Sequence, residues 1–388
     1  MRIEAKIRNN ICLTAHPLGC EEQVKKQINY VKNKGLLEGC KNALIIGSSN
    51  GYGLASRILA SFGCKAKSIG ISFEREGSSK HTATAGWYNE KAIEKLAAEE
   101  GLDSWWINGD AFSREIKAET ARMIGEKLGK IDLLVYSIAA PRRKDPETGE
   151  LFSSVLKPIG EAYTSKLMDF EQGLISETTL EPASEEEIAH TVKVMGGEDW
   201  MLWVDFLLKQ DLLSAGFKTI AYSYIGPQLT AAIYRHGSIG EAKKDLEQKA
   251  LEIDQKLKAV RGKALISVNK ALVTRASAVI PGVSLYISLL YKVMKQKGIH
   301  EVCIEQIDRL FRHCLYGQGP CVIDEKGLLR LDDLEMREDV QAEVARLWEQ
   351  ISSQNIEAIA DIQGFREEFL AHHGFGLEGI DYQADIEP

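Results

Sequence analysis

The feature that most constrains the fold of this chain is a repeated alternation of short apolar runs with amphipathic helical stretches. Each run has the length of a strand, and helical spacing follows the first three of them. The runs are NALIIG (42–47), KSIGISFE (67–74), SWWING (104–109) and IDLLVYSIAA (131–140). Strands that alternate with helices at this pitch predict an α/β fold with a Rossmann-like, doubly wound parallel sheet.

A polar, irregular stretch interrupts this rhythm, and strand patterns then return at KTIAYSYI (218–225) and ALISVN (264–269). Within the stretch, Ser184 and Glu187 form the pattern of a capping box that opens a helix. Beyond residue 281 the chain looks mainly helical. We therefore predict one unit of 388 residues. Its parts are an N-terminal segment (1–40), a Rossmann-type core (41–140 and 215–280), an insertion (141–214) and a C-terminal helical cap (281–388).

Composition excludes several classes of function. The net charge of −8 argues against a nucleic-acid partner, and no apolar run reaches the ~18 residues of a membrane span. No secretion signal opens the chain, so we expect a cytoplasmic protein. The seven cysteines are odd in number and contain no CxxC pair, and no HExxH occurs. We expect neither a metal site nor a disulfide framework.

The first chemical motif is GSSNGYG, residues 47–53, directly after the first predicted strand. Glycines at its first, fifth and seventh positions let backbone approach a pyrophosphate, which the next helix N-terminus can bind. The alternative interpretation is a glycine-rich turn without a ligand. The position after a buried strand favours a dinucleotide site, and the absence of GK[ST] argues against a mononucleotide P-loop.

An acidic residue follows at the end of the second predicted strand. Glu74, 21 residues after Gly53, is placed to bind the hydroxyls of the adenosine ribose, which favours NADH over NADPH. Arg75 beside it is able to receive a 2′-phosphate, and a solvated loop acid is the plainer alternative. Further candidates at the ends of the third and fourth strands are Asp110, Ala111, Ile138 and Ala139.

Tyr234 precedes Lys243 by nine positions. On one helix this spacing turns the two side chains about 180° apart, with a rise of roughly 13.5 Å. Ser238 and Glu241 form a capping-box pattern, however, which starts the helix near Ile239 and leaves Tyr234 in the turn before it. Lys243 is then able to reach back and stabilise a tyrosine that assists a developing oxyanion. The alternative is a packing tyrosine and a solvated lysine.

The chain resembles, over essentially its whole length, the trans-2-enoyl-CoA and enoyl-[acyl-carrier-protein] reductases of the FabV/TER type. These enzymes belong to the short-chain dehydrogenase group, and a Tyr-x8-Lys spacing sets them apart. The motifs that carry the resemblance include HPLGC, IIGSSNGYGLASR, TAGWYN, IDLLVYSIAAPRRKDPETG, VMGGEDW, AYSYIG, YRHGSIGEAKKDLE and SVNKALVTRASAVIP. The resemblance implies NADH-dependent reduction of the C2=C3 bond of trans-2-enoyl thioesters, with hydride delivered to the β-carbon and Tyr234 stabilising or protonating the enolate.

The resemblance also implies further roles. Tyr224 contacts the substrate, while Tyr222 on the same strand face is expected to pack. The cofactor residues implied are Gly47, Ser48, Ser49, Asn50, Gly51, Tyr52, Phe73, Glu74, Asp110, Ala111, Ile138, Ala139, Lys243, Leu272, Val273 and Thr274. The basic run 142–144 is a candidate landing patch for a CoA or acyl-carrier-protein carrier, with a solvated loop as the alternative.

Three functions stay open from the sequence alone. The enoyl-thioester reductase leads, acting on either carrier and expected to be a monomer. A carbonyl or ketoacyl reductase would use the same tyrosine and lysine on a C=O bond. A non-catalytic NADH-binding protein is the third, and the intact pair of Tyr234 and Lys243 argues against it.

Overall fold

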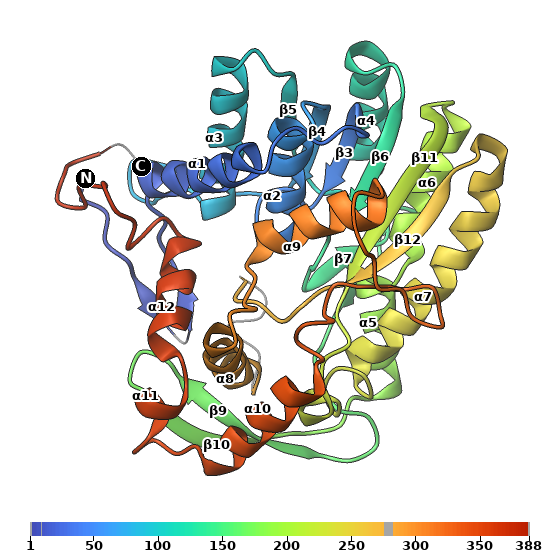
Figure 1. Ribbon diagram of the computed structural model, residues 1–388. Helices are drawn as coiled ribbons and strands as arrows, with labels where there is room; N and C mark the ends of the chain where they lie inside the picture. The colour runs from blue at the N-terminus through green and yellow to red at the C-terminus, as the bar shows by residue number, and fades with distance from the viewer. Residues whose placement is uncertain (1, 9, 275–281, 387–388) are drawn as a thin grey trace.

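The computed structural model describes residues 2–8, 10–274 and 282–386. Its centre is a sheet of seven parallel strands in the order β13-β12-β11-β6-β3-β4-β5, which confirms the doubly wound α/β prediction (Figure 1). Along the chain the strands are β3 (Asn42–Ile46), β4 (Lys67–Ser72), β5 (Ser104–Asn108), β6 (Ile131–Tyr136), β11 (Leu213–Ser223), β12 (Lys263–Val268) and β13 (Leu329–Arg330). Part of one predicted motif, residues 275–281, lies outside the described residues.

The central strands are buried along most of their length because helices cover both faces of the sheet. On β3, Ala43 and Ile45 enter one hydrophobic core, while Leu44 and Ile46 enter the other. Helices of the first face are α1 (Pro17–Asn33), α2 (Gly51–Ile58), α3 (Ala85–Glu99) and α9 (Cys303–Arg309); those of the second are α4 (Arg114–Lys127), α6 (Glu198–Lys209) and α7 (Ser238–Leu257). Near the N-terminus, β1 (Ile7–Arg8) pairs with β2 (Ile11–Cys12).

The insertion is more regular than its polar sequence suggested. It forms two antiparallel hairpins and then a helix, α5, which begins with the predicted capping box of Ser184 and Glu187. The hairpin strands are β7 (Arg142–Lys144), β8 (Leu151–Ser153), β9 (Tyr163–Asp169) and β10 (Leu174–Leu180), and α5 spans Glu185–Met195. These strands are defined by the hydrogen bonds between them, and such pairing does not require a long apolar run in the sequence.

The C-terminal region lies at the carboxyl ends of the sheet strands, together with the β9–β10 hairpin (Figure 1). The elements at this edge are α8 (Val283–Gln296), α10 (Glu338–Gln350), α11 (Ile356–Ile359) and α12 (Ile362–Ala371), whereas α9 covers the first face and β13 is an edge strand of the sheet. Helix α8 is buried around nearly its whole circumference, packed by α10, α12 and β9. This region therefore closes the edge of the sheet where parallel α/β folds place their ligands.

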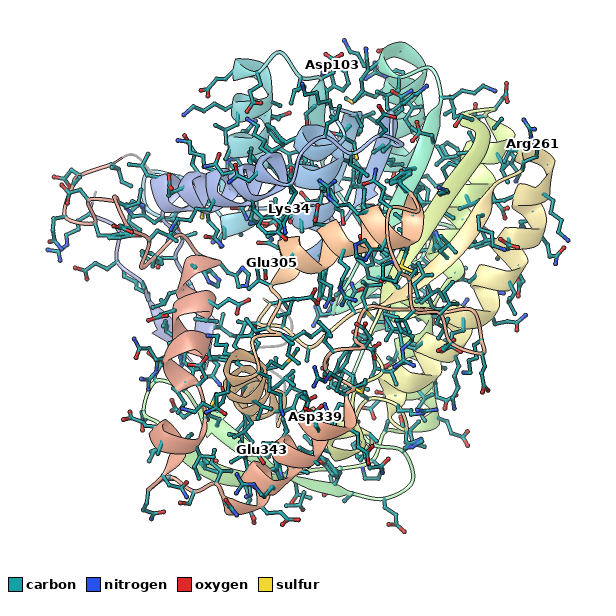
Figure 2. The ribbon with its side chains drawn as sticks, in the orientation of Figure 1. Lys34, Asp103, Arg261, Glu305, Asp339 and Glu343 are labelled. Atoms are coloured by element: carbon teal, nitrogen blue, oxygen red, sulfur yellow. A yellow bond between two sulfur atoms is a disulfide. The ribbon has the colours of Figure 1, made fainter. Side chains whose placement is uncertain are left out.

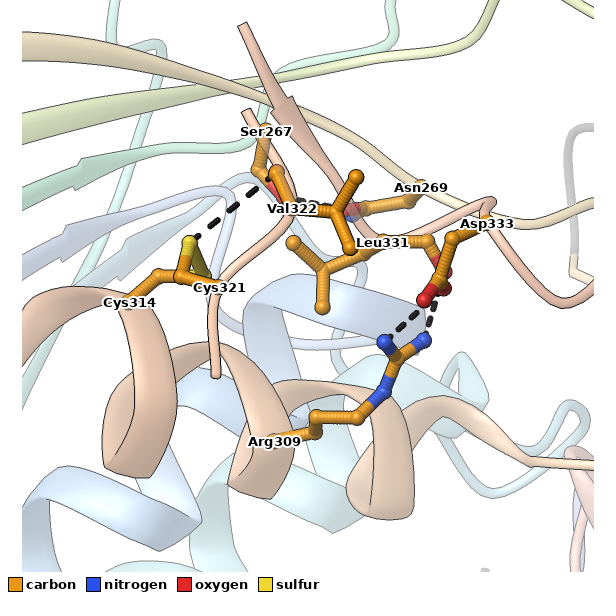
Figure 3. Close-up of a disulfide and its surroundings, with 8 residues drawn as sticks. All are labelled: Ser267, Asn269, Arg309, Cys314, Cys321, Val322, Leu331 and Asp333. Carbon is orange, nitrogen blue, oxygen red and sulfur yellow. Dashed lines mark hydrogen bonds and ion pairs between the residues drawn. A yellow bond between two sulfur atoms is a disulfide. The ribbon is translucent and has the colours of Figure 1, made fainter. Parts of the chain in front are cut away.

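One sequence prediction about cysteine is wrong. Cys314 and Cys321 form a disulfide, with their Cα atoms 5.0 Å apart (Figure 3). A π-helical turn, Leu310–Leu315, ends just after Cys314, and the chain then doubles back through Gly317, whose φ is 71°. An odd cysteine count does not reveal such a local reversal. The other five cysteines are free thiols.

No helix in the described part of the chain is long and apolar enough to cross a membrane. Among the same residues, no cluster of three or more His, Cys, Asp or Glu side chains is placed to hold a metal ion.

Candidate active site

The glycine-rich loop joins β3 to α2 at the carboxyl edge of the sheet, as the sequence predicted. Gly47 has a φ of 85°, and a Cβ atom there would lie 2.1 Å from the carbonyl oxygen of Ser137. At Gly53 a Cβ atom would lie 1.9 Å from the carbonyl oxygen of Gly47. Both positions exclude any side chain. Asn50, the residue before α2, gives the helix no side-chain cap. The loop thus brings bare backbone to the start of a helix, the arrangement that binds a pyrophosphate.

Glu74 lies two residues beyond β4, and its carboxylate holds the glycine-rich loop. Its Oε1 accepts hydrogen bonds from Ser49 Oγ (2.7 Å) and Asn50 Nδ2 (3.3 Å). Its backbone is paired in both directions with the side chain of Asn108. Glu74 is only 8% exposed. The loop and the acidic residue expected to bind ribose are therefore one connected unit, and the alternative of a solvated loop acid is wrong.

The other predicted strand-end residues lie along the same edge with different surroundings. Phe73 is 78% exposed and Ala139 is exposed, so both side chains are open to solvent. Asp110 accepts from the amide of Phe112 (2.9 Å), which fixes the turn after β5. The carbonyl of Ala111 accepts from Lys117 and Trp203. The fourth strand ends at Tyr136, so Ile138 and Ala139 follow the strand rather than end it.

The segment after β12 comes close to the glycine-rich loop. The hydroxyl of Tyr52 donates to the carbonyl of Lys270 (2.7 Å), and a Cβ atom at Gly51 would lie 3.6 Å from Thr274 Cγ2. Leu272 and Val273 are buried, and Thr274 is half-buried. The structure thus gathers the two separate groups of predicted cofactor residues in one place.

Within this segment, the backbone of Val273 is held from two sides. Its amide donates to the hydroxyl oxygen of Tyr291 (3.0 Å), and its carbonyl lies 2.8 Å from His372 Nε2. Both partners come from the C-terminal region. That region therefore fixes the backbone that the family resemblance assigns to the nicotinamide end.

Tyr234 lies in a turn, and α7 begins after it at Ser238, which confirms the predicted helix start between Tyr234 and Lys243. A Cβ atom at Gly240 would lie 2.5 Å from the carbonyl oxygen of Tyr234, so this glycine lets the turn pack directly against the helix. Burial first, and the nearby Glu335 carboxylate second, raise the pKa of Tyr234. The phenol therefore keeps its proton at neutral pH.

The predicted capping box at this helix start is wrong. The N-cap is Gly237, and no side chain caps the helix. Ser238 instead binds the insertion: its Oγ donates to the carbonyl of Val155 (2.6 Å) and accepts from the amide of Lys157 (3.2 Å). The amide of Ser238 also donates to the carbonyl of Lys157 (2.9 Å). A distant chain segment has replaced the local cap.

Tyr224, one residue beyond β11, meets Tyr234 edge to face with ring centroids 4.8 Å apart. Its hydroxyl donates to Glu335 Oε1 (3.1 Å). Tyr222, on the same strand, packs against Tyr52, and its hydroxyl lies 2.5 Å from Ser56 Oγ. The structure thus pairs Tyr224, not Tyr222, with the turn tyrosine.

Lys243 lies one turn and a half into α7 and is half-buried. Its Nζ donates to the carbonyl of Tyr222, two residues before Tyr224 (3.4 Å). Burial lowers the pKa of Lys243 to about 8. The side chain therefore reaches back to the end of β11, and it carries a positive charge at neutral pH.

Sequence reasoning missed Glu335 in this group. This residue is fully buried, and it contacts Tyr224 from 111 positions away.

Sequence reasoning also named the basic run 142–144 as a surface patch. Arg143 of that run is 1% exposed and pairs with Glu198, so it does not belong to such a patch.

Three family models match successive parts of the chain. The trans-2-enoyl-CoA reductase catalytic region matches residues 81–316, and the NAD(P)H binding domain of trans-2-enoyl-CoA reductase matches residues 2–79. A model described as an enoyl reductase FAD binding domain matches residues 323–386.

The C-terminal segment does not fit a flavin site. Within its described residues, the only strand is the two-residue β13, and no glycine loop joins a strand to a helix there. Helix α10 opens with Glu338 and Asp339, whose charges repel a pyrophosphate. Figure 2 labels Asp339 and Glu343 on this helix. Asp339 pairs with Lys297, and Glu343 pairs with Arg346. We derive no chemistry from a flavin.

Relatives of known activity match the full length of the chain. The trans-2-enoyl-CoA reductase [NADH] of Ruminiclostridium cellulolyticum is 54% identical over 100% of this chain and 98% of its own. The enoyl-[acyl-carrier-protein] reductase [NADH] of Flavobacterium johnsoniae is 54% identical over 99% of this chain and 97% of its own. A crystal structure of Clostridium acetobutulicum trans-2-enoyl-CoA reductase in complex with NADH superposes with a TM-score of 0.97 at 46% identity, covering 100% and 98% of the two chains. The chain therefore belongs to the trans-2-enoyl-CoA reductase family.

Proposed function

We propose that the chain reduces the C2=C3 double bond of trans-2-enoyl thioesters with NADH, and that Tyr234 and Lys243 are its catalytic pair. Membership of the family supports the reaction. The observation that carries the catalytic assignment is the turn before α7. It places the Tyr234 phenol against Tyr224 while Lys243 reaches the end of the same strand.

NADH, when bound, supplies the hydride that reaches the β-carbon of the substrate. The glycine-rich loop and the segment after β12 would hold it, because the first offers bare backbone at a helix start and the second lies beside that loop. Glu74, which fixes the loop through Ser49, would face the adenosine ribose. Its charge favours NADH over NADPH.

Tyr234 acts on the thioester carbonyl. Charge develops on this oxygen when the β-carbon gains a hydride, and a phenol that keeps its proton is able to donate a hydrogen bond to it. The same hydroxyl is a proton source for the enolate. Lys243, charged below about pH 8, stabilises negative charge near the end of β11 and binds the cofactor. Tyr224 contacts the substrate beside Tyr234.

The C-terminal region, residues 281–388, is the proposed substrate side of a single working unit. Its helix α8 lies at the carboxyl edge of the sheet, and its buried Tyr286 hydroxyl donates to the same Glu335 carboxyl group as the hydroxyl of Tyr224. We also propose a monomer that works in the cytoplasm, where NADH and acyl thioesters are both made. Sedimentation and cell fractionation test these two points.

A substrate panel tests the proposed reaction. NADH oxidation is followed with crotonyl-CoA, longer enoyl-CoAs, the matching enoyl-acyl-carrier proteins and acetoacetyl-CoA. We expect turnover with the enoyl thioesters and at least a hundredfold lower kcat/KM with the ketoacyl thioester. A preference for the ketoacyl thioester would overturn the proposal in favour of a carbonyl reductase. The ratio between the two carriers identifies the physiological one.

A further inference from the structure

Glu335 is a buried carboxyl group that joins three separate parts of the site. Its Oε1 accepts hydrogen bonds from the hydroxyls of Tyr286 on α8 (2.7 Å) and Tyr224 after β11 (3.1 Å). Its Oε2 accepts from the amide of Ala271, at the start of the segment after β12 (2.7 Å). Glu335 is 0% exposed, so no water competes for these bonds from the surface. One side chain thus links the substrate tyrosine to the proposed nicotinamide segment.

The turn that carries Glu335 is itself fixed. The amides of residues 331 and 332 both donate to the carbonyl of Val268, at the end of β12 (2.9 and 3.1 Å). Arg309 on α9 binds Asp333 with an ion pair of 2.8 Å (Figure 3). The backbone carbonyl of Glu335 accepts from Gln341 (2.7 Å). Because the turn is tied to both the sheet and α9, the carboxyl group has little freedom to move.

Hydrogen bonds, rather than an ion pair, compensate the cost of burying this carboxyl group. In the described part of the chain, no Lys, Arg or His forms an ion pair with Glu335. The positive charge of Lys270 lowers the pKa of Glu335, but the Lys270 ammonium group donates to the carbonyl of Ala271 (3.1 Å). Burial raises the pKa of Glu335 to about 7, and its hydrogen bonds to Tyr286 and Ala271 oppose that rise. Both protonation states are therefore populated near neutral pH.

We propose that Glu335 is a positioning residue of the reductase, which holds the Tyr224 hydroxyl and the Ala271 amide together so that the substrate tyrosine and the nicotinamide-side backbone keep one relative placement. This inference depends on the proposed function, which assigns those roles to Tyr224 and to residues 272–274. The bonds themselves are properties of the structure.

The protonation of Glu335 also sets the direction of the Tyr224 hydrogen. As a carboxylate, Glu335 takes that hydrogen, so Tyr224 turns only lone pairs toward the substrate. As an acid, Glu335 donates its own hydrogen to the Tyr224 oxygen, which frees the phenol hydrogen for the thioester oxygen. The two states differ only in the O–H bond of the Glu335 carboxyl group. The titratable groups that influence Glu335 or titrate beside it are Tyr224, Tyr234, Tyr286, Lys270 and Asp332.

Two substitutions separate position from charge. In Glu335→Gln the amide oxygen still accepts from Ala271, and the amide group donates to Tyr224, as the protonated acid does. In Glu335→Asp the charge stays, but the shorter side chain withdraws from all three partners. For each variant we would measure kcat/KM for crotonyl-CoA at saturating NADH from pH 6 to 8.5, the Kd of NADH by fluorescence, and the Tm.

We expect wild-type kcat/KM to fall in a step centred near pH 7. Below pH 7.5, where Lys243 stays charged, Glu335→Gln should lack that step and stay within threefold of the acid-side value of the wild type. Glu335→Asp should lose at least tenfold in kcat/KM and raise the Kd of NADH at least threefold. The proposal would be overturned if Glu335→Gln kept the step. It would also be overturned if Glu335→Asp left kcat/KM and the Kd of NADH unchanged. If Glu335→Asp fails to fold, the presence or absence of the pH step in Glu335→Gln still tests the proposal.

Glu368→Gln is the matched control. Glu368 is a half-buried carboxyl group whose pKa burial raises to about 7, but it hydrogen-bonds Tyr291 rather than a substrate tyrosine. Its substitution should leave the step near pH 7 in place, and loss of the step there would also contradict the assignment to Glu335. A wild-type enzyme inactive on every enoyl thioester would instead refute the proposed function, so the two failures are distinguishable.

Discussion

The cofactor side and the substrate side of this site are built in opposite ways. On the cofactor side, one continuous stretch of strand, loop and helix supplies residues 47–53, and the requirement is for backbone without side chains. On the substrate side, Tyr224, Tyr286 and Glu335 come from three distant segments and meet through buried polar groups. The first depends on steric space and the second on hydrogen bonds that must all be made. Substitutions on the two sides should therefore fail differently.

The largest expected effect is at Gly47 on the cofactor side. Gly47→Ala places a methyl group 2.1 Å from a backbone carbonyl, so the loop must move, at a cost of about 3 kcal/mol and with NADH affinity lowered more than a hundredfold. Gly35→Ala is the matched control, because Gly35 has a similar φ of 80° with no atom within 4 Å. It should cost about 1–2 kcal/mol and leave NADH binding unchanged. Thermal unfolding and NADH fluorescence measure both, and equal effects would contradict the steric explanation.

The next effect concerns charge where the two sides meet. Lys243 is charged below its pKa of about 8 and neutral above it, so NADH affinity should fall as the pH rises through 8. Loss of a charged hydrogen bond amounts to about 2 kcal/mol, or roughly thirtyfold in Kd. Lys243→Met should bind weakly at every pH, and Lys243→Arg should remove the pH dependence. NADH titrations between pH 7 and 9.5 check this, and an unchanged slope in Lys243→Arg would assign the titration to another group.

A smaller effect is expected at the support of the cofactor loop. Glu74→Gln weakens the bonds from Ser49 and Asn50 but adds no bulk. We expect the Kd of NADH to rise about fivefold to tenfold, since a charged hydrogen bond becomes a neutral one. Glu76→Gln, at an exposed position of the same loop, is the control. Equal NADH affinity in the two variants would show that Glu74 does not contribute to cofactor binding.

The smallest effect on activity is expected far from both sides. Cys321→Ser opens the Cys314–Cys321 disulfide, whose short loop limits the loss of stability to about 2–3 kcal/mol. The Tm should fall by a few degrees while kcat and KM stay unchanged. A change in NADH Kd would show that this disulfide, near the end of β12, acts on the site (Figure 3).

The same contrast explains what the sequence could predict. Apolar runs and glycine spacing predicted six of the seven strands, the glycine-rich loop and its place at the sheet edge, because each is a local property of the chain. The helix start between Tyr234 and Lys243 was also predicted, although the capping box was wrong. A segment from the insertion binds Ser238 there, and no local sequence pattern predicts that contact.

Glu335 could not be predicted for a physical reason. It stands in the stretch LDDLEMRED, whose acidic residues read as a solvated loop. Only the fold brings two phenols and one amide to its carboxyl group, and those partners make its burial tolerable. The short strand β13 was missed likewise, because its pairing with β12 defines it rather than its composition.

The most direct test of the central claim is the turnover of Tyr234→Phe. Phenylalanine keeps the ring that packs on Tyr224 and removes only the hydroxyl group. We predict that kcat with crotonyl-CoA falls at least a hundredfold while the Kd of NADH changes less than threefold. Tyr222→Phe, which loses a hydroxyl bonded to Ser56, should stay within threefold of the wild type in both quantities. Near-normal turnover by Tyr234→Phe would contradict the account.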